Sequence, residues 1–188
     1  MPSTCDPQYA PAGDVSAALL LMDSRLKTIY SDDRESGPDD EQRMLVRNFM
    51  ASMGPGGAYE LVDGTCTIIY MLMTWLRECH EAHDKDVLEY VVPGFVEAMS
   101  RMTRSVAPEV IPTMVGMVVA AGTGLSPNLW RMQYGNWTEE EMAPLEVTAF
   151  LLAEQINRIT DDRGFAVRML ADALTLAEED LAEEDAED

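Results

Sequence analysis

The residues whose types and spacing come closest to a chemical site are Cys79, His80 and His83. On a helix, Cys79 and His83 are four residues apart and share a face, while His80 and His83 are three residues apart. A cysteine and a histidine at this spacing match two of the four ligands of a zinc site. A thiol beside an imidazole is also the arrangement of a nucleophile and its base. The sequence therefore offers these residues as candidates for a small helical metal-dependent enzyme.

The same positions have a simpler interpretation as part of a helix core. Leu76, Cys79 and His83 follow one another at intervals of three and four residues, which is the spacing of a stripe on one helix face. Cys66 lies thirteen residues before Cys79, about 20 Å along a continuous helix at ~1.5 Å per residue, so it cannot complete a metal site there. On balance the sequence predicts no catalytic residue, no metal and no cofactor.

A second candidate site is the segment 130–137, in which aromatic residues surround one arginine. Trp130, Arg131, Tyr134 and Trp137 all fall within these eight residues. Trp, Tyr and Arg are the residues most enriched at the energetic centres of protein–protein interfaces. The segment therefore predicts a partner-binding loop between two helices. The alternative is that its aromatic rings fill the core of the protein itself.

The charge of the chain is strongly negative and unevenly distributed. The formal net charge is −21, to which residues 1–87 contribute −8, residues 88–137 nothing and residues 138–188 the remaining −13. Such a surface repels phosphates and anionic lipids, so we expect no direct binding of nucleic acid or membranes. It attracts proteins with a basic surface. The neutral middle of the chain predicts a centre that is buried or that forms an oligomer interface.

Cysteine usage and the first residues indicate where the chain works. The three cysteines, Cys5, Cys66 and Cys79, lack the number and spacing of a disulfide framework, which predicts a reducing, cytoplasmic location. Residues 1–13 have neither the basic nor the apolar part of a signal peptide and are predicted to be a flexible leader. The one long uncharged run, residues 110–130, is interrupted by Pro and Gly, so it predicts a buried helix rather than a membrane span.

The elements that must position these residues are helices, because apolar side chains recur every three to four residues along most of the chain. We expect an all-α, single-domain bundle of six to eight helices around a long central helix. The first three expected helices cover residues 14–30, 38–53 and 63–91. A fourth is opened by Pro93-Gly94, and a fifth runs from Pro112 to Gly122. A sixth begins at a capping box formed by Thr138 and Glu141, and the last is capped by Asp161 or Asp162. Pro144 predicts a kink or restart in the sixth of these.

The end of the chain is the most acidic part of the sequence. Eight of its last eleven residues, 178–188, are Asp or Glu. Negative charge at the carboxyl end of a helix opposes the helix dipole, so the last helix is expected to fray there into a solvated tail. The expected organisation is thus a leader over 1–13, a helical domain over 14–177 and an acidic tail over 178–188.

Together these observations predict a non-enzymatic, cytoplasmic accessory or adaptor protein that binds another protein, one with a basic surface, or that forms a homo-oligomer. Two alternatives remain. In the first, the acidic surface mimics nucleic acid and occupies a basic DNA-binding site, which requires carboxylates spaced along one face. The other alternative is the metal-dependent enzyme that uses Cys79, His80 and His83.

Overall fold

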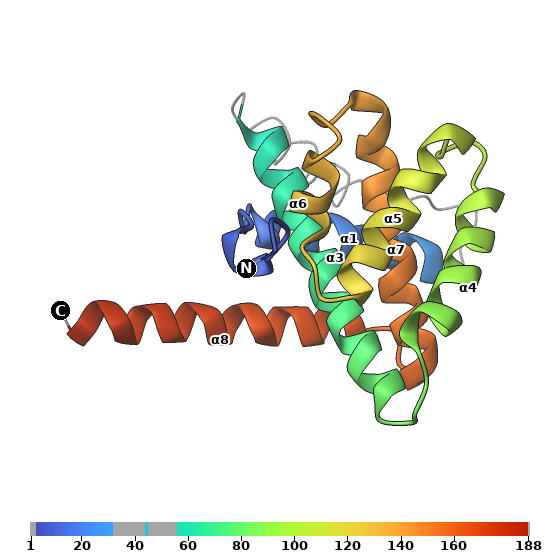
Figure 1. The fold of residues 1–188 in the computed structure, drawn as a ribbon. Coiled ribbons are helices and arrows are strands. Elements are labelled where there is room, and N and C mark those ends of the chain that lie inside the picture. Colours follow the sequence, from blue (N-terminus) through green and yellow to red (C-terminus); the bar gives the residue numbers. More distant parts are fainter. Residues whose placement is uncertain (1–2, 32–43, 45–55, 188) are drawn as a thin grey trace.

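In the residues that the structure describes, helices form where the sequence repeats apolar residues at helical spacing, and there is no strand. The structure is a computed structural model that describes residues 3–31, 44 and 56–187, with backbone only for 181–187. Its α-helices are α1 (Val15–Tyr30), α3 (Gly57–Glu81), α4 (Val87–Arg101), α5 (Ile111–Gly122), α6 (Pro127–Met132), α7 (Glu139–Thr160) and α8 (Phe165–Glu187) (Figure 1). Two 3-10 turns, η1 (Pro7–Tyr9) and η2 (Pro108–Val110), precede α1 and α5. The prediction of one all-α bundle is confirmed.

Helix α3 is the centre of this bundle. It contacts every other α-helix of the described part of the chain, and Figure 1 shows it running through the molecule from end to end. Its side chains Ile68, Ile69, Leu72 and Met73 are completely buried. An apolar run on all sides of a helix predicts neighbours on several sides, and α3 has them.

The boundary between α3 and α4 differs from the prediction of one helix over residues 63–91. Helix α3 begins at Gly57 and ends at Glu81, and Asp84 then adopts a left-handed conformation with a φ of 54°. The carboxylate of Asp86 caps α4 by accepting the N–H of Leu88 at 2.8 Å. Asp tolerates left-handed geometry better than most residues and is a preferred N-cap, so this polar segment ends one helix and starts the next. Pro93 therefore lies inside α4 and does not open it.

Helix α7 starts as predicted and continues further than predicted. The capping box of Thr138 and Glu141 is present, which confirms that prediction. The expected restart at Pro144 is wrong, because α7 is continuous from Glu139 to Thr160. A proline removes one backbone hydrogen bond, here close to the start of the helix. The buried side chains that follow it, such as Leu145 and Leu152, hold the helix on the bundle.

The described part of the predicted leader, residues 3–13, is packed on the bundle. Cys5 is buried, and its carbonyl oxygen accepts the N–H of Ser126 at 2.8 Å. Further on, a Cβ atom on Gly13 would lie 2.2 Å from the backbone nitrogen of Gly64, so two glycines let the chain cross α3 in close contact. A composition rich in Pro and poor in apolar residues predicts a free segment, but these backbone contacts attach it. The predicted helix over residues 38–53 lies outside the described residues except for Met44.

Helix α8 leaves the bundle partway along its length. Ala166 and Leu170 are completely buried, whereas every residue from Thr175 to Asp180 is exposed. The backbone nevertheless remains helical to Glu187, and Figure 1 shows this part projecting away from the other helices. The structure thus differs from the expected fraying at residue 178.

Candidate functional site

Arg131, predicted to contact a partner, lies inside the protein. Its side chain forms a two-pronged ion pair with Glu141 of α7, in which Nε and Nη2 lie 2.6 and 2.7 Å from the two carboxylate oxygens. It also donates to the carbonyl oxygens of Gly135 at 3.0 Å and Asn136 at 3.1 Å. Arg131 is 6% exposed. The guanidinium therefore holds the α6–α7 connection in shape and presents no charge to the solvent.

Glu141 forms the ion pair with Arg131 and also takes part in the cap at the start of α7. Its Oε2 atom accepts hydrogen bonds from the backbone N–H and the hydroxyl of Thr138, at 2.8 and 3.0 Å. Burial acts to raise the pKa of Glu141, but the hydrogen bonds from Arg131 and Thr138, together with the charge of Arg131, lower it below its ordinary value. The carboxylate is therefore held in its charged form.

The three aromatic residues of the segment lie beside Arg131 but differ in exposure. The Trp137 ring centre is 5.2 Å from the guanidinium carbon, and its indole N–H donates to Asn128 at 3.2 Å. The Trp130 ring is packed so closely on α5 that a Cβ atom on Gly116 would lie 2.1 Å from it. Tyr134, in contrast, is 71% exposed. The structure brings the four predicted residues together, and only Tyr134 is mainly at the surface.

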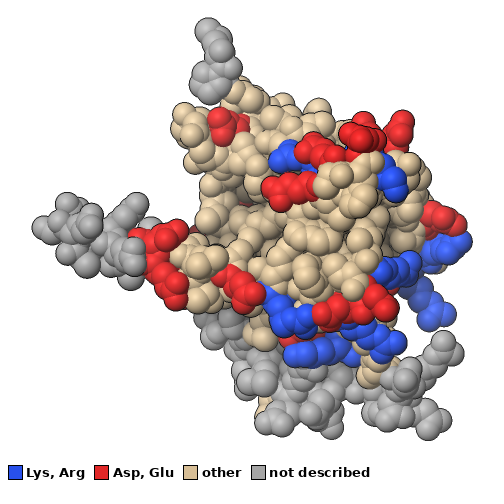
Figure 2. Space-filling model, turned by 90° about the horizontal axis from the view of Figure 1, so that it is seen from below, with Lys and Arg blue, Asp and Glu red and all other residues tan. Residues whose placement is uncertain are grey.

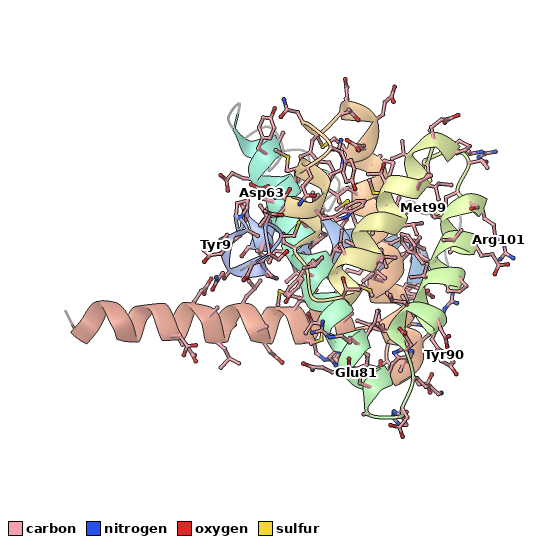
Figure 3. The ribbon with its side chains drawn as sticks, viewed as in Figure 1. Tyr9, Asp63, Glu81, Tyr90, Met99 and Arg101 are labelled. Carbon is pink, nitrogen blue, oxygen red and sulfur yellow. The ribbon has the colours of Figure 1, made fainter. Side chains whose placement is uncertain are left out.

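A second polar group links α6 to the central helix. The side-chain amide of Asn128, which is buried, donates to the carboxylate of Asp63 at 2.6 Å. Partial burial raises the pKa of Asp63 and the charge of Glu60 adds to this effect, while the hydrogen bond from Asn128 acts against it. Asp63 lies toward the amino end of α3, as Figure 3 shows. Sequence reasoning missed this pair, because the two residues are 65 positions apart.

The predicted metal candidates do not point to a common centre. Nδ1 of His80 donates to the carbonyl oxygen of Leu76 at 2.7 Å, and Nδ1 of His83 donates to that of Cys79 at 2.9 Å. Because α3 ends at Glu81, His83 lies beyond the helix and is exposed. Within the residues that the structure describes, no three His, Cys, Asp or Glu side chains are arranged to hold a metal ion. In Figure 3, the labelled residues Glu81 and Tyr90 lie on either side of the turn between α3 and α4.

The projecting part of α8 is a third candidate, and sequence analysis treated it only as a tail. It carries the exposed acids Glu178, Glu179 and Asp180. Figure 2 shows acidic side chains in red on the projecting helix. These three residues are consecutive, so their side chains leave the helix about 100° apart. Carboxylates placed around a helix do not form the single line of charges that mimicry of a nucleic acid requires. Leu176 of the same segment is 61% exposed.

No family model, no curated protein and no solved structure matches the chain. Across the described residues, no helix has both the length and the apolar composition needed to cross a membrane. What the fold and the candidate sites define is a helical bundle with a buried arginine network and one projecting acidic helix.

Proposed function

We propose that the protein is a non-enzymatic adaptor that binds another protein through the projecting end of α8. The observation that carries this proposal is that α8 stays helical for about three turns after it leaves the bundle. Helices in proteins owe most of their stability to the packing of one face. A helical segment with exposed side chains, as residues 175–180 of α8 are, has the form of those helices that bind in the groove of a partner.

The charge of this end specifies the kind of partner. The last eleven residues contain eight acids, and the exposed part of the helix begins at Thr175. Such a concentration of negative charge attracts a basic surface over a distance and speeds association at low salt. The partner is therefore a protein with a cluster of Lys and Arg residues. The proposed setting is the cytoplasm, in accord with three cysteines that are all unpaired thiols.

The test is affinity capture from the native host with quantitative mass spectrometry, using the full chain and two charge variants. The first variant neutralises the helix: Glu178→Gln, Glu179→Gln and Asp180→Asn. The matched control makes the same change in net charge at exposed acids of α4 and η2: Glu89→Gln, Glu97→Gln and Glu109→Gln. We expect the wild type and the control to capture a basic protein that the first variant fails to capture. Equal capture by the two variants contradicts the proposal.

Tyr134 is a second proposed contact, because it is the one of the four predicted contact residues that is mainly exposed. Met132, 44% exposed, lies close to it in the chain. Since Trp130 is packed on Gly116, changing Trp130 tests the core and not the surface. Tyr134→Ala removes the exposed ring alone and is expected to weaken capture of the partner without changing the helical circular-dichroism signal. Undiminished capture would rule out this contact.

A further inference from the structure

The connection between α6 and α7 holds Tyr134 on a fixed backbone. The N–H of Tyr134 donates to the carbonyl oxygen of Arg131 at 3.0 Å. The guanidinium of Arg131 in turn donates to the carbonyl oxygens of Gly135 and Asn136, the two residues that follow Tyr134. Gly135 has a φ of 115°, a conformation that L side chains rarely adopt, so the chain can turn sharply at this position. A contact residue that is already held in place loses little conformational freedom when it binds a partner.

The ring of Tyr134 is supported from one side and open on the other. Its centre lies 5.2 Å from the centre of the Trp130 ring, at an interplanar angle of 59°. Trp130 is itself partly buried against the core, whereas Tyr134 is 71% exposed. In the described part of the chain, Lys and Arg side chains lie over the rings of Tyr30, Tyr90 and Trp137 but not over that of Tyr134. The exposed ring is thus a rigid aromatic surface that these cations leave open.

The exposed charge on the same stretch of chain is negative. Arg131 is the only Lys or Arg between residues 105 and 157, and its charge is paired with Glu141 inside the protein. Glu139 and Glu140, in the first turn of α7, are both exposed. The ion pair joins the end of α6 to this first turn, and Figure 1 shows the connection and the start of α7 at the same end of the bundle. Such a surface attracts a cation and repels a second copy of the chain, which carries a net charge of −21.

We infer that the surface formed by Tyr134, Glu139 and Glu140 binds an arginine side chain of the partner protein. A guanidinium group is planar and weakly hydrated, so it stacks on an aromatic ring while its N–H groups donate to carboxylates. A lysine ammonium is a compact and strongly hydrated charge, so it gains less from the ring. The chain uses the same contact internally, since the guanidinium carbon of Arg163 lies 5.2 Å from the centre of the Tyr30 ring. This inference rests on the proposed contact at Tyr134 and adds the side chain that this contact recognises.

Two short peptides of equal charge serve as probes for this surface. In the first peptide Arg alternates with Gly, and in the second every Arg is replaced by Lys. Each peptide carries a fluorophore and is titrated with the full chain at low salt, with binding followed by fluorescence anisotropy. The acids of the chain attract both peptides, so the ratio of the two dissociation constants isolates the preference for the guanidinium group. We expect the wild type to prefer the Arg peptide.

Three variants locate the preference on the ring of Tyr134. Tyr134→Leu keeps an apolar side chain without the ring and is expected to lower the preference about two- to fivefold, the value of an exposed cation–π contact. Tyr134→Phe keeps the ring and is expected to retain the preference. The matched control, Tyr9→Leu, makes the same change at a tyrosine of η1 that is 64% exposed, and it is expected to leave the preference unchanged.

The role of the two acids is tested by a matched pair of double variants. Glu139→Gln with Glu140→Gln removes the carboxylates beside the ring, and Glu89→Gln with Glu97→Gln removes two exposed carboxylates of α4. We expect the first double variant to weaken binding of the Arg peptide more than the second does. Equal losses would overturn the placement of the arginine between the ring and these acids.

The remaining outcomes separate this inference from the proposed function. A preference that Tyr134→Leu leaves unchanged, or that Tyr134→Phe removes, overturns the inference, because the ring is then not the contact. Neutralising Glu178, Glu179 and Asp180 is expected to weaken binding of both peptides and to leave the preference in place. A preference lost on that change would place the arginine contact on α8 and would also overturn the inference. Capture of a host protein that depends on α8, found together with no preference for Arg, would leave the proposed function standing without this contact.

Discussion

Replacing Arg131 by Ala tests whether the predicted binding segment is a surface or a part of the core. In the structure the change removes the partner of a carboxylate that is itself only 6% exposed, that of Glu141. It also removes the donor for the carbonyl oxygens of Gly135 and Asn136. If Arg131 instead contacted a partner from the surface, its loss would leave the fold intact.

The expected loss of unfolding free energy follows from the burial of the Arg131–Glu141 pair. Removing one member of a buried ion pair costs about 3–5 kcal/mol, because the other charge stays buried without compensation. Domains of this size have an unfolding free energy of about 5–15 kcal/mol, so Arg131→Ala is expected to remove about a fifth or more of the stability. The pair of Arg158 and Glu154 is the matched control, since the Arg158 side chain is 76% exposed. An ion pair whose arginine is exposed to solvent contributes about 0–1 kcal/mol, which is the loss expected for Arg158→Ala.

Urea unfolding followed by far-ultraviolet circular dichroism and tryptophan fluorescence measures both variants. Glu141→Gln and the double variant complete a cycle with Arg131→Ala. We expect the double variant to be less destabilised than the sum of the single variants, because each single change already breaks the same pair. A loss below about 1 kcal/mol for Arg131→Ala, equal to that of Arg158→Ala, would refute the buried ion pair.

Three further predictions concern other contacts. Hydrogen bonds and charge lower the pKa of Glu141 in the folded protein, so its contribution to stability is complete at neutral pH and is lost as the pH falls through that folded pKa. The difference in stability between the wild type and Glu141→Gln should therefore shrink in acid. Urea titrations at several pH values measure this difference, and a constant value would contradict the prediction. Gly116→Ala places a methyl group against the Trp130 ring and is expected to cost about 1–3 kcal/mol, seen as a lower melting temperature, whereas an unchanged value would mean that the ring moves freely. Asp86→Ala removes the cap of α4 and is expected to cost about 1 kcal/mol in urea unfolding, and no loss would place the start of α4 elsewhere.

Local signals in the sequence predicted much of the fold. The apolar spacing of residues 14–30 gave the position of α1, and its predicted cap, Asp14, accepts the N–H of Ala17 at 2.9 Å. Pro112 and Gly122 bounded α5 to within a residue. The capping box predicted the start of α7. In each case the signal and the structure it determines lie within a few residues of each other, so no tertiary information was needed.

The errors arose where a local signal competed with a neighbouring one. Pro93 resembled a helix start, but the actual start is six residues earlier, where Asp86 supplies the cap. The composition around Arg131 is typical of an interface, and the same residue types also suit a buried network. Only the position of Glu141 on the next helix decides between them, and that position is a property of the fold. The sequence did contain one hint, since Arg131 is the only charged residue between Glu109 and Glu139.

The structure also changes the meaning of the uneven charge. The neutral middle of the chain was open to two interpretations, a buried centre or an interface. Burial accounts for much of it, because Met114, Met117 and Val118 of α5 are completely buried and Arg131 is neutralised inside the protein. Burial does not explain the charge at the end of α8. The acids there weaken their own helix, and the exposed Leu176 lacks the packing that stabilises the rest of α8. Folding of this chain does not require that composition, and this contrast is the physical reason why we propose α8 as the binding element.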